Sequence, residues 1–243
     1  MPEPPGLGTI RSRVTGGRKI AVPHAVDTRA RALRASRSYR PVLALAVASF
    51  LFLAFSPDEP WSRGTLLLIE AAMLVVALWT SREGGLAPRL LIVAVAVLVA
   101  LAQLISDGRG LTTTAALLNG AFLVAVAVVI AGGIVSAGEV NQQTVTGAIT
   151  VYLLLGLFFS YLYSVMAVLG SGSFFAQGTD GTTADRLYFS FVTLTTVGYG
   201  DYAPAGDLGH TLANLEALVG QLYLVTVVAL LVSQMPAAQR SDR

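Results

Sequence analysis

Cysteine is absent from this chain, and charged residues are scarce. Only 12% of the 243 residues are charged, against about 25% in soluble domains, and the mean hydropathy is +0.69. Without cysteine, a disulfide scaffold, a thiolate metal site and a thiol redox switch are excluded. The two histidines, His24 and His210, have no nucleophile or metal-ligand pattern beside them, so an enzyme is disfavoured. The composition is that of an integral membrane protein.

Lysine is nearly absent as well, and most basic residues precede the first apolar run. This N-terminal group consists of Arg11, Arg13, Arg18, Lys19, Arg29, Arg31, Arg34, Arg37 and Arg40. We expect residues 1–40 to form a disordered cytoplasmic tail that fixes topology, with anionic lipid headgroups as its candidate partner. Nucleic-acid binding is disfavoured because interleaved aromatic residues are missing. The preference for arginine indicates a GC-rich prokaryotic genome.

Apolar runs suitable for transmembrane helices occur six times along the chain. They cover residues 41–56, 65–80, 88–105, 113–136, 146–170 and 207–234. A spanning helix needs roughly 20 mostly apolar residues, so the first two runs are short. The sequence predicts an all-α protein of the plasma membrane with six spans. Both termini, including the short tail 235–243, are then cytoplasmic.

The segment between the last two spans, residues 171–206, is the most informative. Residues 184–195 are apolar and aromatic, but as a helix they cover only about 18 Å, so they can enter a membrane without crossing it. Thr182 and Asp185 have the spacing of a capping box at the start of this helix. Directly after it comes a glycine-rich stretch. Non-helical backbone at membrane depth requires surrounding protein or a water-filled pore.

That stretch resembles the selectivity filter of the potassium channel family. Its residues are Thr196, Val197, Gly198, Tyr199, Gly200 and Asp201. The resemblance implies that the backbone carbonyls of the first four residues replace the hydration shell of K⁺, with Gly200 and Asp201 at the outer end. Glycine permits the backbone angles that this requires. Because the motif occurs once per chain, a homotetramer is implied, with K⁺ as the permeant ion and no cofactor.

The chain departs from the family pattern next to the filter. Tyr188 and Phe189 occupy positions where many members carry a pair of tryptophans that brace the filter. Val192 stands where some members have a glutamate, so a carboxyl contact from that position to Asp201 is excluded. Bracing by the two aromatic residues, and different inactivation behaviour, are therefore expectations.

The resemblance covers about residues 146–234 and continues into the last span. Asp201, Pro204, Gly209 and Gly220 have the spacing seen in two-span potassium pores. Gly220 is either the hinge of the inner helix or a packing position.

One face of the last span is expected to line the cavity. It consists of Ala217, Gln221, Leu224 and Val228, which recur at i, i+4, i+7 and i+11. Gln221 would form a ring of four amides below the filter, and the last two residues an apolar gate. The alternative is an ordinary contact with lipid or another helix.

Glu216 is an ionisable residue inside the last span and is therefore a functional candidate. A bond to Thr193, Thr195 or a tyrosine such as Tyr161 would make it structural. Partial exposure to the cavity would make it attract cations, and pH sensing is a further hypothesis.

The first four spans, residues 41–136, are similar in number to those of six-span potassium channels. In those channels the fourth helix senses voltage with regularly spaced arginines, whereas residues 113–136 contain none. Glu70, Gln103 and Asn119 are polar residues in these spans. We expect them to satisfy one another, or to mark a ligand site if they cluster. A cytoplasmic connector, 137–145, would follow.

The sequence favours a potassium channel pore domain at 146–234 that conducts K⁺ passively without an arginine-type voltage sensor. One alternative is a non-conducting or regulatory subunit of a hetero-oligomeric channel. Another is a K⁺ transporter subunit, although such transporters carry four degenerate repeats in one chain. The tail after the last span is too short for a nucleotide- or Ca²⁺-binding gating domain, so the stimulus stays open.

Overall fold

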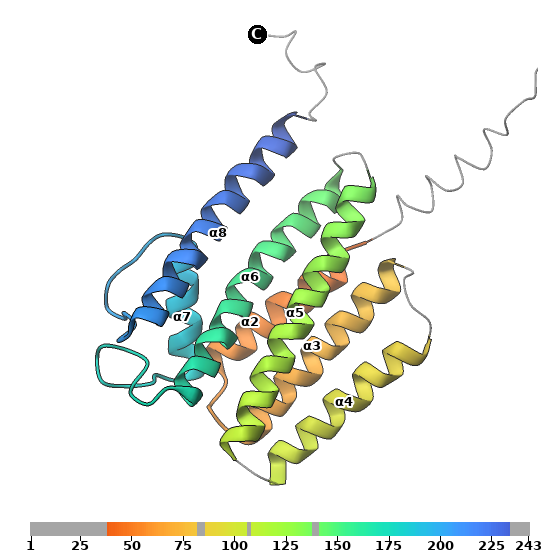
Figure 1. The fold of residues 1–243 in the computed structure, drawn as a ribbon. Helices are drawn as coiled ribbons and strands as arrows, with labels where there is room; N and C mark the ends of the chain where they lie inside the picture. Colours follow the sequence, from red (N-terminus) through yellow and green to blue (C-terminus); the bar gives the residue numbers. More distant parts are fainter. Residues whose placement is uncertain (1–37, 82–85, 106–107, 138–140, 234–243) are drawn as a thin grey trace, which may run out of the picture. The chain divides into compact units, whose positions relative to one another are not determined.

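The computed structural model describes residues 38–81, 86–105, 108–137 and 141–233 (Figure 1). The helices are α2 Arg40–Phe55, α3 Pro60–Ser81, α4 Leu86–Ile105, α5 Arg109–Ala137, α6 Gln142–Leu169, α7 Thr183–Leu194 and α8 Asp207–Ser233. Phe175 also forms isolated bridges to Thr179 and Pro204. In the described ranges the protein is therefore all-helical, as the sequence predicts. Most of the two expected tails lies outside these ranges.

Several helices begin earlier than the apolar runs that predict them. Helix α6 begins at Gln142, four residues before the apolar run 146–170 and within the expected connector 137–145. The reason is a cap: the side chain of Asn141 accepts hydrogen bonds from the backbone N–H groups of Gln143 and Thr144, at 2.9 and 3.1 Å. Such a cap satisfies N–H groups that the helix leaves unpaired. Hydropathy alone does not detect these polar first turns.

Four helices in the described part of the chain are long and apolar enough to cross a membrane, namely α3, α4, α5 and α6. Helix α2 is apolar but has 16 residues, and α8 has 27. Large apolar side chains are exposed along α4, among them Leu90, Leu98 and Leu101. Exposed apolar surface of this kind suits contact with lipid acyl chains.

Helices α2, α3, α5 and α6 share one apolar core, whose fully buried members include Leu67, Met73, Leu123 and Leu157. Helix α3 packs against α2, α4 and α5, and α5 lies along α6 (Figure 1). The first four helices are thereby joined to α6. Inside a membrane such a core is stabilised by van der Waals packing between the helices, because lipid tails are as apolar as these side chains.

The short helix α7 lies beside both α6 and α8 (Figure 1), and glycines permit the close approach. A Cβ at Gly156 in α6 would lie 2.5 Å from the ring of Phe191, and one at Gly220 in α8 would lie 2.5 Å from the carbonyl oxygen of Leu194. Phe191 also meets Phe50 of α2, with ring centroids 4.9 Å apart. The short helix is thus held on three sides.

Candidate functional site

The N-terminus of α7 is capped twice. The predicted capping box is confirmed: Thr182 N–H donates to Asp185 Oδ2 at 2.8 Å, and Asp185 N–H donates to Thr182 Oγ1 at 3.1 Å. A second carboxylate, Asp58 from the α2–α3 loop, accepts from the backbone N–H of Thr183 at 2.9 Å and from its hydroxyl. Negative charge is favourable at a helix N-terminus, so both carboxylates fix the start of α7.

The filter-like segment that follows has an unusual backbone. Within the described residues, Thr196 is the only non-glycine residue with positive φ, at 59°, and Gly198 and Gly200 have φ of 57° and 80°. For a β-branched residue this conformation is a genuine outlier, and such strain gathers at functional sites. The N–H groups of Val197 and Gly198 donate to the carbonyl of Val192 at 2.9 and 3.3 Å. This ties the segment to the end of α7.

Every second residue of this segment, Thr196, Gly198 and Gly200, therefore has positive φ. The side chains of Val197 and Tyr199 are 52% and 72% exposed in the single chain. The single chain therefore does not enclose this segment.

The outer end of the segment is braced by side chains. Tyr188 donates to Asp201 Oδ2 at 2.7 Å, and Gln177 donates to the Asp201 carbonyl at 2.6 Å. The rings of Tyr188 and Tyr199 are parallel, with centroids 6.4 Å apart. The pKa of Tyr202 is raised by the negative charge of Asp185, by desolvation and by a hydrogen bond to the Asp185 carboxylate. This hydroxyl is therefore protonated at neutral pH. Tyr188 thereby supplies the contact to Asp201 that a valine at position 192 cannot make.

Phe189 belongs to a separate aromatic cluster behind α7. It is buried, and its ring centroid lies 5.0 Å from that of Tyr163 and 5.6 Å from that of Phe175. Phe174 completes the contact, 6.2 Å away. The loop before α7 is thereby fastened to α6 through aromatic packing, which typically adds about 0.5–1.5 kcal/mol per pair.

Glu216 is fully buried between α6, α7 and α8, but its partners differ from those expected. Its two carboxylate oxygens accept hydrogen bonds from the hydroxyls of Ser190 and Tyr163, both at 2.5 Å. Ser190 also lies 2.7 Å from the Gly156 carbonyl. Tyr161 is not a partner of Glu216. Two residues apart on a helix, the two tyrosines point in nearly opposite directions, so only Tyr163 faces α7.

The residues expected to line a cavity lie on α8. Ala217 is half-buried, and Gln221 and Leu224 are exposed in the single chain. The side chain of Val228 lies outside the part of the chain that the structure describes. Gly220 faces the end of α7, where it permits helix packing as described above.

Comparison with known proteins locates this site in a family. Residues 147–236 match a family described as ion channels. An 89-residue stretch is 34% identical to the inward rectifier potassium channel Kirbac3.1 of Paramagnetospirillum magnetotacticum, covering 36% of this chain and 30% of the relative. This part of the chain is similar to potassium channels. In a second relative, probable potassium channel protein 2 of Methanocaldococcus jannaschii, 94 residues are 36% identical, covering 37% and 24%.

The match extends to eukaryotic members of the potassium channel family. Human potassium voltage-gated channel subfamily A member 4 is 33% identical over 84 residues, covering 32% of this chain and 13% of that protein. The chain therefore spans less than a third of the length of these relatives. No solved structure matches the chain significantly.

Glu70, Gln103 and Asn119 do not bond to one another, contrary to the expectation. Glu70 Oε1 accepts from Tyr161 at 2.8 Å and from Ser49 at 3.2 Å. In the described ranges, both side-chain polar atoms of Gln103 and the Oδ1 atom of Asn119 are buried without a hydrogen-bond partner. The same ranges contain no cluster of three or more acidic, histidine or cysteine side chains suited to a metal ion.

Replacement of Tyr188 by phenylalanine tests the outer brace. We expect the fold to persist but ion flux to decline severalfold faster during sustained conduction, because Asp201 loses the 2.7 Å bond. The measurement is the time course of K⁺ flux from proteoliposomes. Tyr202→Phe is the control, since its hydroxyl faces Asp185 instead. If K⁺ flux decayed at the same rate in both variants and in the parent, the Tyr188–Asp201 bond would not brace the outer end of the segment.

Proposed function

We propose that the chain is the pore subunit of a K⁺-selective channel that conducts passively as a homotetramer. The observation that carries this proposal is the backbone of Thr196, Gly198 and Gly200, with positive φ at alternate residues directly after a capped 12-residue helix. Carbonyls aligned in this way can replace the hydration shell of K⁺. The permeant ion sites are the carbonyls of residues 196–199.

Four chains are proposed because one segment supplies only one side of the ion cage. The exposed Val197 and Tyr199, and the exposed apolar residues Leu218, Leu222 and Val225 of α8, are surfaces that neighbouring subunits would cover. We place α7 as a re-entrant helix whose C-terminal end favours a cation in the cavity. Helices α2 and α8 complete six spans, with both termini cytoplasmic.

The chain is further proposed to lack arginine-type voltage sensing. The only basic residue of α5 is Arg109, at its first position. Moving gating charge across the membrane requires several such residues per subunit.

Mass and flux of the purified chain test the proposal together. We expect native mass spectrometry to show four copies, and proteoliposomes to pass K⁺ in preference to Na⁺ with block by Ba²⁺. A stable monomer without flux would favour the regulatory-subunit alternative. Flux of K⁺ coupled to a second ion gradient would favour a transporter.

Gln221 is proposed to line the cavity below the filter. Gln221→Leu would replace four amides by apolar groups, so we expect lower single-channel conductance and weaker block by cations applied from the cytoplasmic side. Planar bilayer recording measures both quantities. Leu98→Met, at an exposed position of α4, is the control. Unchanged conductance in Gln221→Leu would remove this residue from the cavity.

A further inference from the structure

A groove of about 540 Å³ lies between the first helix and the filter-like segment. Its lining comes from α2, from one side of α7 and from the filter-like segment, and it includes Phe50, Ala54, Tyr188, Phe191, Val197 and Tyr199. This side of α7 faces away from α6 and α8, because Tyr188 projects nearly opposite to Ser190, which bonds to both of those helices. The groove is therefore open on the single chain.

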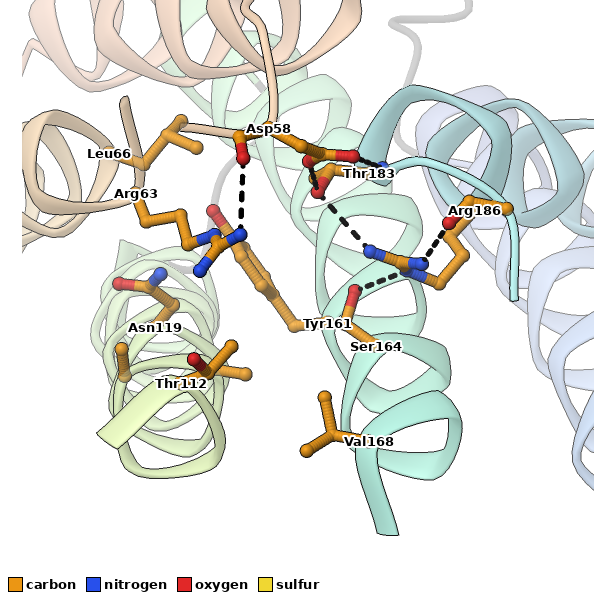
Figure 2. Close-up of a pocket in the computed structure, with 13 residues that line it drawn as sticks. Asp58, Arg63, Leu66, Thr112, Asn119, Tyr161, Ser164, Val168, Thr183 and Arg186 are labelled. Carbon is orange, nitrogen blue, oxygen red and sulfur yellow. Dashed lines mark hydrogen bonds between the residues drawn. The ribbon is translucent and has the colours of Figure 1, made fainter. Parts of the chain in front are cut away.

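Two contacts fix α2 beside α7 and so give the groove its shape. Near the end of α7, the rings of Phe50 and Phe191 meet edge to face with centroids 4.9 Å apart. At its start, Asp58 in the loop after α2 accepts hydrogen bonds from the backbone N–H of Thr183, at 2.9 Å, and from its hydroxyl (Figure 2). Because α2 is held at both ends of α7, the groove is a built feature of the fold.

The groove is mainly apolar, since several of its polar side chains are already engaged. Asp185 accepts from the backbone N–H of Thr182 at 2.8 Å, and the Tyr188 hydroxyl donates to Asp201 at 2.7 Å. The hydroxyl of Thr195 donates to the backbone carbonyl of its own helix, four residues earlier, at 2.6 Å. A charged partner would lose its hydration here without gaining new bonds. The lining favours an apolar occupant.

Helix α8 carries an apolar face that matches this requirement. Leu215, Leu218 and Leu222 recur at i, i+3 and i+7, so they share one side of the helix. Their side chains are 49%, 61% and 64% exposed in the single chain. This side differs from the one that packs on α7, which carries Glu216 and Gly220. The three leucines are therefore free to contact another molecule.

The groove and this leucine face lie at the same depth in the membrane. Within one chain, Ser190 bonds to Glu216, and Leu194 lies against Gly220. The second half of α7 is thus level with the middle of α8. In an assembly whose rotation axis is parallel to the membrane normal, equivalent residues of all copies have the same depth. The leucine face of a neighbouring α8 is then level with the groove.

We propose that the groove receives the leucine face of α8 from a neighbouring copy of this chain, which makes α2 part of the subunit interface. This inference rests on the proposed tetramer and adds where its copies meet. Groove and leucine face are different surfaces of one chain, and contacts of this head-to-tail kind close into a ring when the rotation fits. Leucines packed against Phe50 and Ala54 contribute van der Waals contact, which drives association of helices in lipid.

The interface joins the first helix of one subunit to the inner helix of the next. Helix α2 contacts α7 of its own chain through Phe50. In the proposed assembly it also contacts the neighbour's α8, which carries the proposed cavity face. A displacement of α2 therefore acts on the pore of two subunits at once.

Cross-linking in membranes tests this interface, and the absence of cysteine from the chain leaves only the introduced thiols to react. We expect the double variant Ala54→Cys with Leu215→Cys, treated with a thiol-to-thiol linker of about 10 Å, roughly one helix diameter, to give linked species of two, three and four chains on a denaturing gel. The matched control is Ala54→Cys with Val225→Cys. Val225 is exposed on α8 but lies ten residues, about 15 Å, further along the helix, so we expect only single chains.

Native mass spectrometry of the same variants separates failure of this inference from failure of the proposed function. Four copies together with linkage in the Leu215 pair alone support the interface. Four copies without linkage would mean that lipid or another part of the chain fills the groove, which overturns the inference and leaves the channel proposal standing. Equal linkage in both pairs would show unspecific collision and would also overturn it. A single copy without linkage would contradict the interface and the tetramer together.

Discussion

Gly198→Ala is expected to abolish K⁺ selectivity or conduction altogether. Gly198 has a φ of 57°, and a Cβ there would meet no atom within 4 Å. The cost is therefore conformational and not steric: a left-handed backbone costs about 1–2 kcal/mol for an L-residue with a side chain. In a tetramer the cost arises four times around one axis. The alanine variant relieves it by rotating the peptide group, which turns a carbonyl away from the ion.

The matched control for this substitution is Gly206→Ala. Gly206 lies in the same outer region and has no positive φ, and a Cβ added there would meet no atom within 4 Å. We expect its K⁺ flux and its preference over Na⁺ to equal those of the parent. Selectivity retained in Gly198→Ala, with protein of normal mass and thermal stability, would mean that these carbonyls do not coordinate the ion.

Gly220→Ala is expected to destabilise the protein by roughly 1–3 kcal/mol, the usual cost of overpacking. The added Cβ would lie 2.5 Å from the Leu194 carbonyl oxygen and 2.8 Å from its Cδ1 atom. A backbone carbonyl cannot move aside as a flexible side chain can, so α8 has to separate from the end of α7. Leu194 immediately precedes the filter-like segment, and we expect K⁺ selectivity to fall together with thermal stability.

Gly132→Ala in α5 provides the comparison, because it is also a helical glycine but has nothing within 4 Å. The helix propensity of alanine should stabilise that variant by up to about 1 kcal/mol. Thermal unfolding in detergent measures both. A pure hinge role for Gly220 predicts altered opening with unchanged stability, and that result would contradict the packing role.

Much of the helical framework follows from the sequence because membrane helices need long apolar runs. The prediction for α7 is within one residue at each end, since the pair Thr182 and Asp185 marks its start. Helices α3, α5 and α6 begin about four to five residues before their apolar runs, where polar first turns conceal the start.

The partners of buried polar groups were harder to predict. Hydropathy places Glu216 inside a span but does not give the rotation of α6, which decides between Tyr161 and Tyr163. Asp58 was missed because a carboxylate 125 residues before Thr183 carries no local signal for capping it. One clue to Ser190 was in the sequence: a small hydroxyl in the apolar α7 helix has to find a buried acceptor.

The contacts at positions that depart from the family pattern could also be determined only from the structure. Tyr188, at a position where many members carry tryptophan, reaches Asp201 through its hydroxyl. Position 192 has no carboxylate, and Glu216 of α8 bonds to Ser190 of α7 instead of Asp201. Of the two aromatic residues expected to brace the filter, Tyr188 contacts Asp201, whereas Phe189 packs behind α7.

The reversal potential of the reconstituted chain, with K⁺ on one side of a planar bilayer and Na⁺ on the other, tests the central claim most directly. The filter assignment predicts a reversal potential displaced strongly towards the value at which K⁺ alone is at equilibrium, together with Ba²⁺ block, and loss of both in Gly198→Ala. A current that reverses near zero, or one equally selective in Gly198→Ala, would contradict the assignment of residues 196–200 as the K⁺ filter.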